Sequence, residues 1–175
     1  MIKLDPLVVR KVQERYAKCI ASDLSHPERF DGRRYIAPFE VYQGDYRDLE
    51  DLGIQVIDPS EIGYGPARAG DCLAFVMHMV GMRQRSQAWQ RIAKLQPVDA
   101  LEEATIVLYE SYYNAIGRRL PEHVGIVHDR RIISKMGGDE DNAAGGPILK
   151  HDLGAMPYAF HPKSQESVAR LLKHA

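Results

Sequence analysis

The chain has 175 residues, 45% of them hydrophobic, and a formal net charge of −1 at pH 7. This size is enough for one well-packed core, so we expect a single domain over residues 1–175. The balanced charge supplies no overall positive field, which argues against nucleic acid or anionic lipid as a partner. No stretch approaches the ~20 consecutive apolar residues of a transmembrane helix, so we expect no membrane span.

Two cysteines, Cys19 and Cys72, are too few for a secreted domain that depends on disulfides, and both are interpreted as free thiols. The first residues lack the basic segment and apolar run of a cleavable signal peptide. We therefore expect a cytoplasmic protein, or one exported without such a signal. The sequence leaves the oligomeric state open.

The first predicted element is a helix over residues 6–24. Asp5 is placed to cap it and Pro6 suits its first position, while Cys19 falls on its apolar stripe as a small buried side chain. Residues 25–70 contain many glycines and prolines, which favours short turns and strands. Within them we expect one or two helical turns at 45–52 and a short strand at 53–58.

A second helix is predicted to begin near Asp71. Its first turns are apolar nearly all round, which indicates burial on most sides, and Gly81 marks a bend or break. Beyond Gly81 the pattern favours a more exposed amphipathic helix that stops at Pro97.

The second half of the chain changes to the pattern of strands. Strands are predicted at 105–113, 123–127, 131–134 and 147–153, with a polar connection at 117–122 and a terminal helix from Ser164 to Lys173. The expected fold class is α+β, with helices packed on one side of a small antiparallel sheet. Its parts are an N-terminal helix with a wrapping segment (1–67), a core (68–162) and a C-terminal helix (163–175).

A turn at residues 129–130 would set the register of one hairpin. It places Val127 opposite Ile132 and Gly125 opposite Ser134, so Ser134 shares a sheet face with His123. On that face Gly125 would remove bulk where the start of a helix has to approach.

Cys72 and His123 are the candidate catalytic residues. A thiol at a helix start lies at the positive end of the peptide dipole, but an ordinary thiol is only about 3% ionised at neutral pH, and the dipole contributes roughly one pKa unit. An imidazole that takes the proton adds an ion pair, so the two groups together form an activated nucleophile.

Three sequence motifs around these residues resemble those of a known enzyme family. Gly-Asp-Cys before an apolar helix, then His-Val-Gly-Ile-Val, then Arg-Ile-Ile-Ser-Lys resembles the NlpC-type branch of the papain-like cysteine peptidases, over roughly residues 68–160. The resemblance implies a papain-like, NlpC-like fold and acyl transfer, with Cys72 as nucleophile, His123 as base and the Cys72 backbone amide at the oxyanion. Typical substrates of the family are peptidoglycan stem peptides.

The family orients its histidine with a third polar residue on a following strand. Ser134 occupies the matching strand, where His, Asn or Gln is commoner, and His151 lies on the next predicted strand. We favour His151 and keep Ser134 as the alternative. The aromatic-glycine stretch that usually precedes the cysteine is absent.

Other functions are less well supported. The histidines have no metal-ligand spacing, and 139–144 lacks the glycine and one oxygen ligand of a calcium loop, so we expect no metal and no cofactor. A basic helix near Trp89 has no accompanying nucleic-acid motif. The leading hypothesis is a cysteine peptidase or amidase acting on a peptide or amide. The alternatives are a cytosolic deamidase or acyltransferase on the same scaffold, and a non-enzymatic binding domain.

Overall fold

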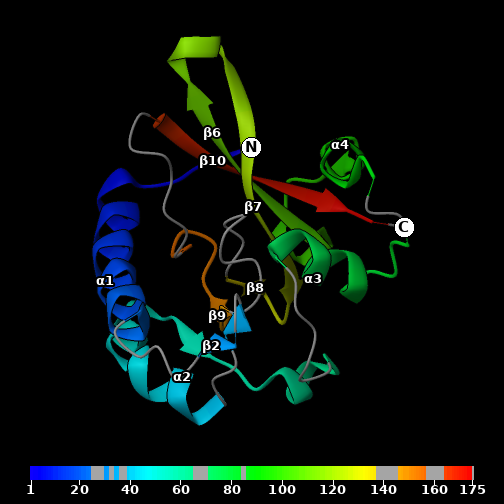
Figure 1. The fold of residues 1–175 in the computed structure, drawn as a ribbon. Coiled ribbons are helices and arrows are strands. Elements are labelled where there is room, and N and C mark those ends of the chain that lie inside the picture. The colour runs from blue at the N-terminus through cyan, green and yellow to red at the C-terminus, as the bar shows by residue number, and fades with distance from the viewer. Residues whose placement is uncertain are drawn as a thin grey trace.

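The computed structural model describes residues 1–24, 30–31, 34–35, 39–64, 71–83, 86–136, 146–156 and 164–174. An eight-stranded sheet dominates it, in the order β1-β10-β6-β7-β8-β9-β4, with β5 also paired to β10 (Figure 1). The paired strands are antiparallel. The strands are β1 (Ile2–Lys3), β4 (Gln55–Val56), β5 (Gln96–Pro97), β6 (Ile106–Tyr113), β7 (Arg118–His128), β8 (Arg131–Lys135), β9 (Ile148–His151) and β10 (Ser164–Lys173). A separate ribbon pairs β2 (Phe30–Asp31) with β3 (Arg34–Tyr35).

Helices lie on both sides of this sheet, with α1 on one side and α3 and α4 on the other (Figure 1). The α-helices are α1 (Pro6–Leu24), α2 (Phe39–Asp45), α3 (Cys72–Met79) and α4 (Ala88–Ala93). Short 3₁₀ turns occur at η2 (Arg47–Leu52), η3 (Pro59–Ile62), η4 (Leu101–Glu103) and η5 (Asn114–Ile116). The expected fold, with helices on one side of a small sheet, is therefore wrong: the sheet is large, most helices are short, and both faces are covered.

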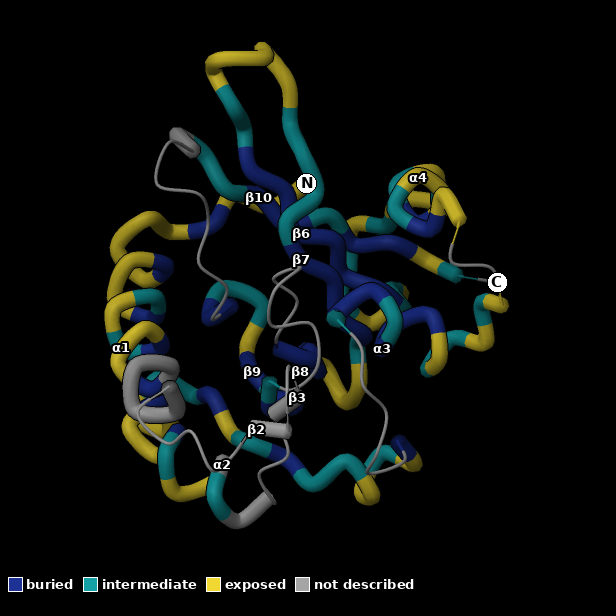
Figure 2. Tube along the Cα trace, in the orientation of Figure 1, coloured by how far each residue is buried: buried dark blue, intermediate teal, exposed yellow. Residues whose placement is uncertain are grey.

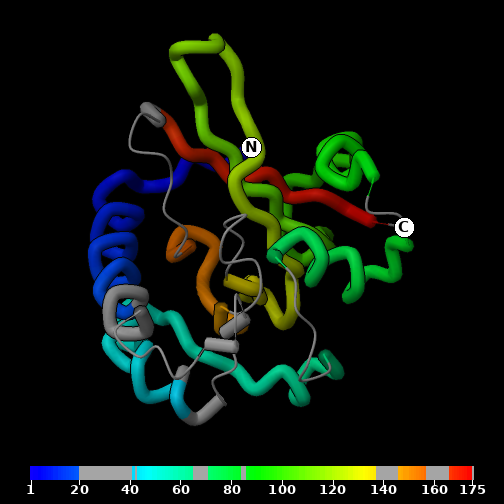
Figure 3. The backbone as a smooth tube through the Cα atoms, in the orientation of Figure 1, coloured from blue at the N-terminus to red at the C-terminus, as the bar shows by residue number. Residues whose placement is uncertain are grey.

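The C-terminal segment shows why the prediction failed. Residues 164–173 form strand β10 and not the expected helix, and Figure 3 shows the N-terminal segment running beside it, where Ile2 lies opposite Ala169. Val168, Ala169, Leu171 and Leu172 are buried, with Leu171 and Leu172 in clusters on different faces. These four apolar residues fall within five positions, a short run that fits one face of a helix as well as a strand buried on both faces.

The other predicted elements agree with the structure in part. Helix α1 has the predicted bounds, and the Asp5 carboxylate accepts the Leu7 N–H over 2.8 Å, although Leu7 itself is exposed. Helix α3 ends before Gly81, whose φ is +72°, and the continuation is only the six residues of α4. The polar connection expected at 117–122 is wrong, because residues 118–122 extend β7 beside β6 and only Gly117 belongs to the turn.

The β7–β8 hairpin has the predicted register. Val127 lies opposite Ile132, and Asp129 and Arg130 form the turn with φ values of +50° and +61°. Positive φ at both central residues is the geometry that matches the twist of the two strands.

Strands β6, β7 and β8 form the centre of the core, which Figure 2 shows as the buried part of the trace. Successive side chains of a strand point to opposite faces, so each strand serves two clusters. The cluster on the α3 face includes Leu73, Phe75, Ile106, Leu108, Val124, Ile126, Ile133, Ile148 and Leu172. The cluster on the α1 face includes Leu4, Val9, Val107, Tyr109, Ile132, Met156, Ala169 and Leu171.

Candidate functional site

Cys72 is the first residue of α3, as the sequence predicted. Asp71 precedes it in extended backbone, and the Asp71 carboxylate accepts the Ala74 N–H over 2.8 Å, which caps the helix. The Cys72 side chain is buried in the cluster between α3 and the sheet. The thiol therefore lies at the positive end of a capped helix, out of water.

Burial decides the charge of this thiol. The pKa of Cys72 is raised to about 11, mainly by burial and in smaller part by the Asp71 carboxylate. Backbone hydrogen bonds from Val124, Leu73 and Cys72 itself act in the opposite direction, because an N–H group stabilises a thiolate. The opposing effects leave the thiol protonated at neutral pH while backbone donors already surround the sulfur.

His123 lies on β7 directly opposite Tyr109 on β6. The two rings have centroids 6.1 Å apart, and the imidazole is 1% exposed. The pKa of His123 is lowered to about 3, mainly by burial and in smaller part by the neighbouring His151. His123 is therefore a neutral imidazole in this conformation.

Cys72, at the start of α3, lies over the part of β7 that contains His123, but the two side chains lie on opposite faces of the sheet. The thiol lies near the backbone N–H of Val124, the residue that follows His123, and this group acts to lower the pKa of the thiol. Val124 belongs to the cluster on the α3 face, whereas Tyr109, the partner of His123, belongs to the cluster on the α1 face. The sheet thus separates sulfur from imidazole in this conformation.

Ser134 and His151, the two candidates for the third residue, are bonded to each other. Ser134 Oγ lies 3.0 Å from His151 Nε2, and His151 Nδ1 lies 2.9 Å from the Asp152 carbonyl oxygen. A carbonyl oxygen can only accept, so Nδ1 carries the proton and Nε2 accepts the Ser134 hydroxyl. Both side chains are fully buried, and burial lowers the pKa of His151 to about 4.

This pair lies on the same face as His123. His151 is opposite Ile132, and its ring centroid is 6.4 Å from that of Tyr109. The structure therefore gathers His123, Ser134 and His151 around Tyr109 on the α1 face, while Cys72 lies on the other side.

Gly125 allows a close contact with a different element from the one predicted. A Cβ on this residue would lie 2.7 Å from both Ile132 Cγ2 and Ser134 Oγ. The missing side chain makes room for strand β8 on the α1 face. The expectation that it makes room for a helix start is wrong, because α3 packs on the other face.

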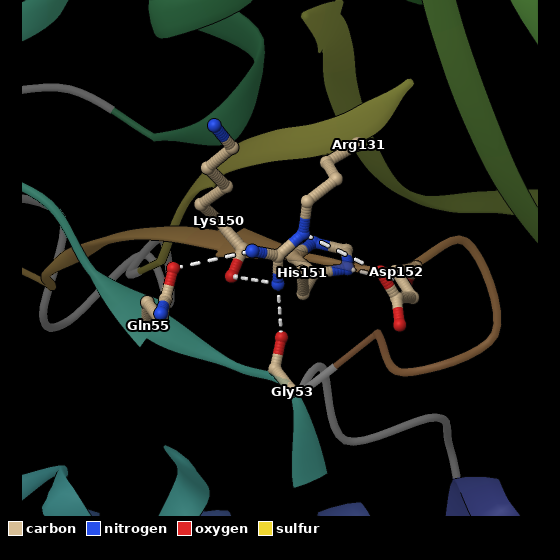
Figure 4. A network of polar contacts seen from close by, with 6 residues as sticks. All are labelled: Gly53, Gln55, Arg131, Lys150, His151 and Asp152. Carbon is tan, nitrogen blue, oxygen red and sulfur yellow. Dashed lines mark hydrogen bonds and ion pairs between the residues drawn. The ribbon is translucent and has the colours of Figure 1, made fainter. Parts of the chain in front are cut away.

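Arg131 forms a network that the sequence did not reveal (Figure 4). Its guanidinium donates to the Gly53 carbonyl, to Gln55 Oε1 over 3.1 Å and to the Lys150 carbonyl over 3.3 Å, and it pairs with Asp152 over 3.3 Å. Arg131 thereby ties β8 to β4 and β9, next to the residue whose carbonyl orients His151. Most of these acceptors are backbone atoms or lie far away in sequence, so no local motif indicates them.

Lys135 is a second residue that the prediction passed over. Its side chain is buried, and Nζ donates to the Gly146 carbonyl over 3.0 Å. Burial lowers the pKa of this amine to about 8. Alternation along β8 places Lys135 on the face opposite to Ser134, which is the α3 face.

The remaining candidate features are a metal site, a calcium loop and a membrane span. Among the described residues, no group of three or more His, Cys, Asp or Glu side chains could hold a metal ion. The calcium-loop candidate at 139–144 lies outside the described residues. None of the described helices is both long and apolar enough to cross a bilayer.

Comparison of the chain with known protein families, with curated proteins and with solved structures finds no match. The function therefore has to be inferred from the chemistry of the residues themselves.

Proposed function

We propose that this protein is a cysteine-dependent amide hydrolase with Cys72 as its nucleophile. The observation that carries the proposal is the position of the sulfur, at the first residue of a capped helix, where the backbone N–H groups of Leu73, of Cys72 itself and of Val124 on the central strand β7 all act to lower the pKa of the thiol. These donors are the groups that stabilise a thiolate and, later, an oxyanion.

The proposed reaction is acyl transfer through a thioester. The thiolate attacks the carbonyl carbon, the carbonyl oxygen becomes an oxyanion held by backbone N–H groups at the start of α3, and the amine leaves with a proton. Water then cleaves the thioester and restores the thiol. His123 is the proposed general base and acid, and the Ser134–His151 pair is proposed to orient the imidazole in its resting position on the α1 face.

This role for His123 requires its imidazole to reach the α3 face. The β6–β7 register shifts between Tyr109 and Glu110, opposite Pro121 and His123, so one extra residue of β7 lies immediately before His123. Such a bulge re-aims side chains and disrupts the local ladder, so we propose that the rearrangement starts in this segment. The described conformation is then the resting state.

The test is hydrolysis of defined amides by purified protein. Muropeptides with peptidoglycan stem peptides are the first substrates to try, followed by protein glutamine side chains, which a deamidase would use, and by added amine acceptors, which would reveal an acyltransferase. Cys72→Ser is expected to lower turnover by a factor of about 10³ or more. Cys19→Ala is the matched control, because Cys19 is a buried thiol in the cluster around α1. Equal turnover by Cys72→Ser and wild type would reject the proposal.

A specific observation favours a second candidate, a non-enzymatic binding domain. The thiol is protonated and the imidazole lies on the other face, so the described conformation contains no assembled thiol–imidazole pair. A binding domain would hold its partner without turnover, and Cys72→Ser would retain the same affinity for it.

A further inference from the structure

Lys135 is an unusual residue for the interior of a sheet. Lys135 is 6% exposed, and its amine has one hydrogen bond among the described residues, to the Gly146 carbonyl. An ammonium has three N–H donors, and lysine is almost never fully buried without an anionic partner. The salt bridges of the described residues join other side chains and leave Lys135 without a carboxylate.

Lys135 and Cys72 belong to the same buried region. The residue opposite Lys135 is Ile148 on β9, and the residue two positions before it on the same face is Ile133. Both isoleucines are members of the cluster that contains Cys72. Helix α3 packs against β7 and β8, so the thiol and the amine face the same layer between helix and sheet.

The other titratable groups of the packed elements are engaged elsewhere or face away. On α3 they are Asp71, which caps the helix, and His78, which lies against Tyr64 at its far end. On β7 they are Arg118, which is exposed; Arg119, which pairs with Glu166; Glu122, which accepts the Tyr113 hydroxyl; His123, on the opposite face; and His128, which pairs with Asp129 at the surface. On β8 and β9 they are Arg131, which is held in its own network; Lys150, which is only partly buried; and His151, which is bonded to Ser134 on the opposite face. Among the described residues, Lys135 is therefore the buried amine on the face of the thiol.

We propose that the ammonium of Lys135 is the cation that allows Cys72 to ionise. The S–H bond of the thiol breaks, hydroxide takes the proton and becomes water, and the thiolate forms in the same layer of the fold as the ammonium. The proposal takes Cys72 as the nucleophile of the proposed function and assigns the stabilising charge to a residue that already lies on the correct face.

The charge of Lys135 agrees with this geometry. Burial lowers the pKa of Lys135 to about 8, so the amine is still mostly protonated at neutral pH, whereas the thiol, of pKa about 11, is not ionised. A positive charge in a buried layer favours the thiolate, because water screens it little there. His123, of pKa about 3, is neutral and lies on the other face, so it supplies no such charge in this conformation.

The first experiment measures the pH dependence of Cys72 alkylation. Wild-type protein carrying Cys19→Ala is treated with iodoacetamide from pH 6 to 11, and modification is followed by mass spectrometry. In the same background, Lys135→Met is expected to move the thiolate midpoint upward and to slow alkylation at pH 8 by about tenfold or more. Lys150→Met, which removes a neighbouring amine on the adjacent strand, is the matched control and is expected to leave the profile unchanged. Identical profiles for the two variants would overturn the proposal.

Two further measurements guard against a trivial loss of structure. Lys135→Arg keeps a cation and is expected to restore much of the wild-type profile. If the role of Lys135 were only structural, Lys135→Met and Lys135→Arg would give the same profile. Titration of ¹³C-labelled lysine side chains by NMR reads the amine directly, and Cys72→Ser is expected to lower the Lys135 midpoint, because linkage between two sites is reciprocal. An unchanged Lys135 midpoint in Cys72→Ser would reject the coupling, even if Lys135→Met fails to fold.

Activity separates this proposal from the proposed function. If amide hydrolysis depends on Cys72 and His123 while Lys135→Met retains full turnover and an unaltered thiol, the enzyme remains and the role of Lys135 is wrong. If no amide is hydrolysed but the thiol midpoint still depends on Lys135, the coupling remains and the hydrolase is wrong.

Discussion

Ser134 donates its hydroxyl to Nε2 of His151 across 3.0 Å, and neither side chain is exposed to water. The Asp152 carbonyl holds the other imidazole nitrogen, so the ring is fixed in one tautomer. A fully paired polar unit of this kind inside a core costs little while it is intact and much when one partner is removed.

Removal of the Ser134 hydroxyl is therefore expected to destabilise the fold. Ser134→Ala leaves His151 Nε2 buried without its donor, which costs about 1–3 kcal/mol of the free energy of unfolding. Urea denaturation of Ser134→Ala, His151→Leu and the double variant measures the coupling between the two. Strictly additive effects would show that the 3.0 Å contact contributes no interaction energy.

Acid is expected to destabilise the protein through the two buried imidazoles. Burial lowers the pKa of His123 to about 3 and of His151 to about 4, against about 6.5 in the unfolded chain. Below pH 6.5 the unfolded state binds two protons that the folded state refuses, so stability is complete above this pH and falls as the pH drops toward 4. The slope is about 1.4 kcal/mol per pH unit for each histidine. Thermal unfolding of His151→Leu across the same range should show a shallower dependence, and an equal slope would contradict the assignment.

Gly125→Ala is expected to be strongly destabilising. The added Cβ would meet two β8 side chains at 2.7 Å and the Ile133 carbonyl oxygen at 3.0 Å, and a backbone atom inside a sheet cannot move aside. Overpacking of this kind costs about 1–3 kcal/mol. Gly154→Ala is the matched control, because nothing lies within 4 Å of its added Cβ. Chemical denaturation of both variants checks the difference, which equal midpoints would refute.

Arg131→Lys is expected to loosen the attachment of β4 to β9. A lysine has one nitrogen, so it cannot reproduce bonds to the Gly53 carbonyl, Gln55 and Asp152 together. We expect a loss of about 1–3 kcal/mol and faster amide hydrogen exchange at residues 54–57. Arg130→Lys changes the neighbouring, exposed arginine, whose ion pair with Glu102 lies at the surface, and should stay within about 0.5 kcal/mol of wild type. Equal exchange rates in the two variants would contradict the role of Arg131.

Local patterns predicted the elements whose hydrogen bonds are themselves local. The capped start of α1, the beginning of α3 at Cys72 and the turn at Asp129 and Arg130 were all visible in the sequence, because caps and tight turns depend on residues within a few positions. The register of Val127 with Ile132 followed from the length of that turn.

Long-range pairing decided the rest. Residues 164–173 form an interior strand because β6 pairs with one side of it and β1 with the other. The packing on the two faces of β7 in turn determined which side chains are buried together. Cys72 and Lys135 lie on the α3 face, and His123 lies on the α1 face with the Ser134–His151 pair. A sequence reports which residues can carry chemistry, but only the stacking of distant segments determines which of them are buried together and with what charge.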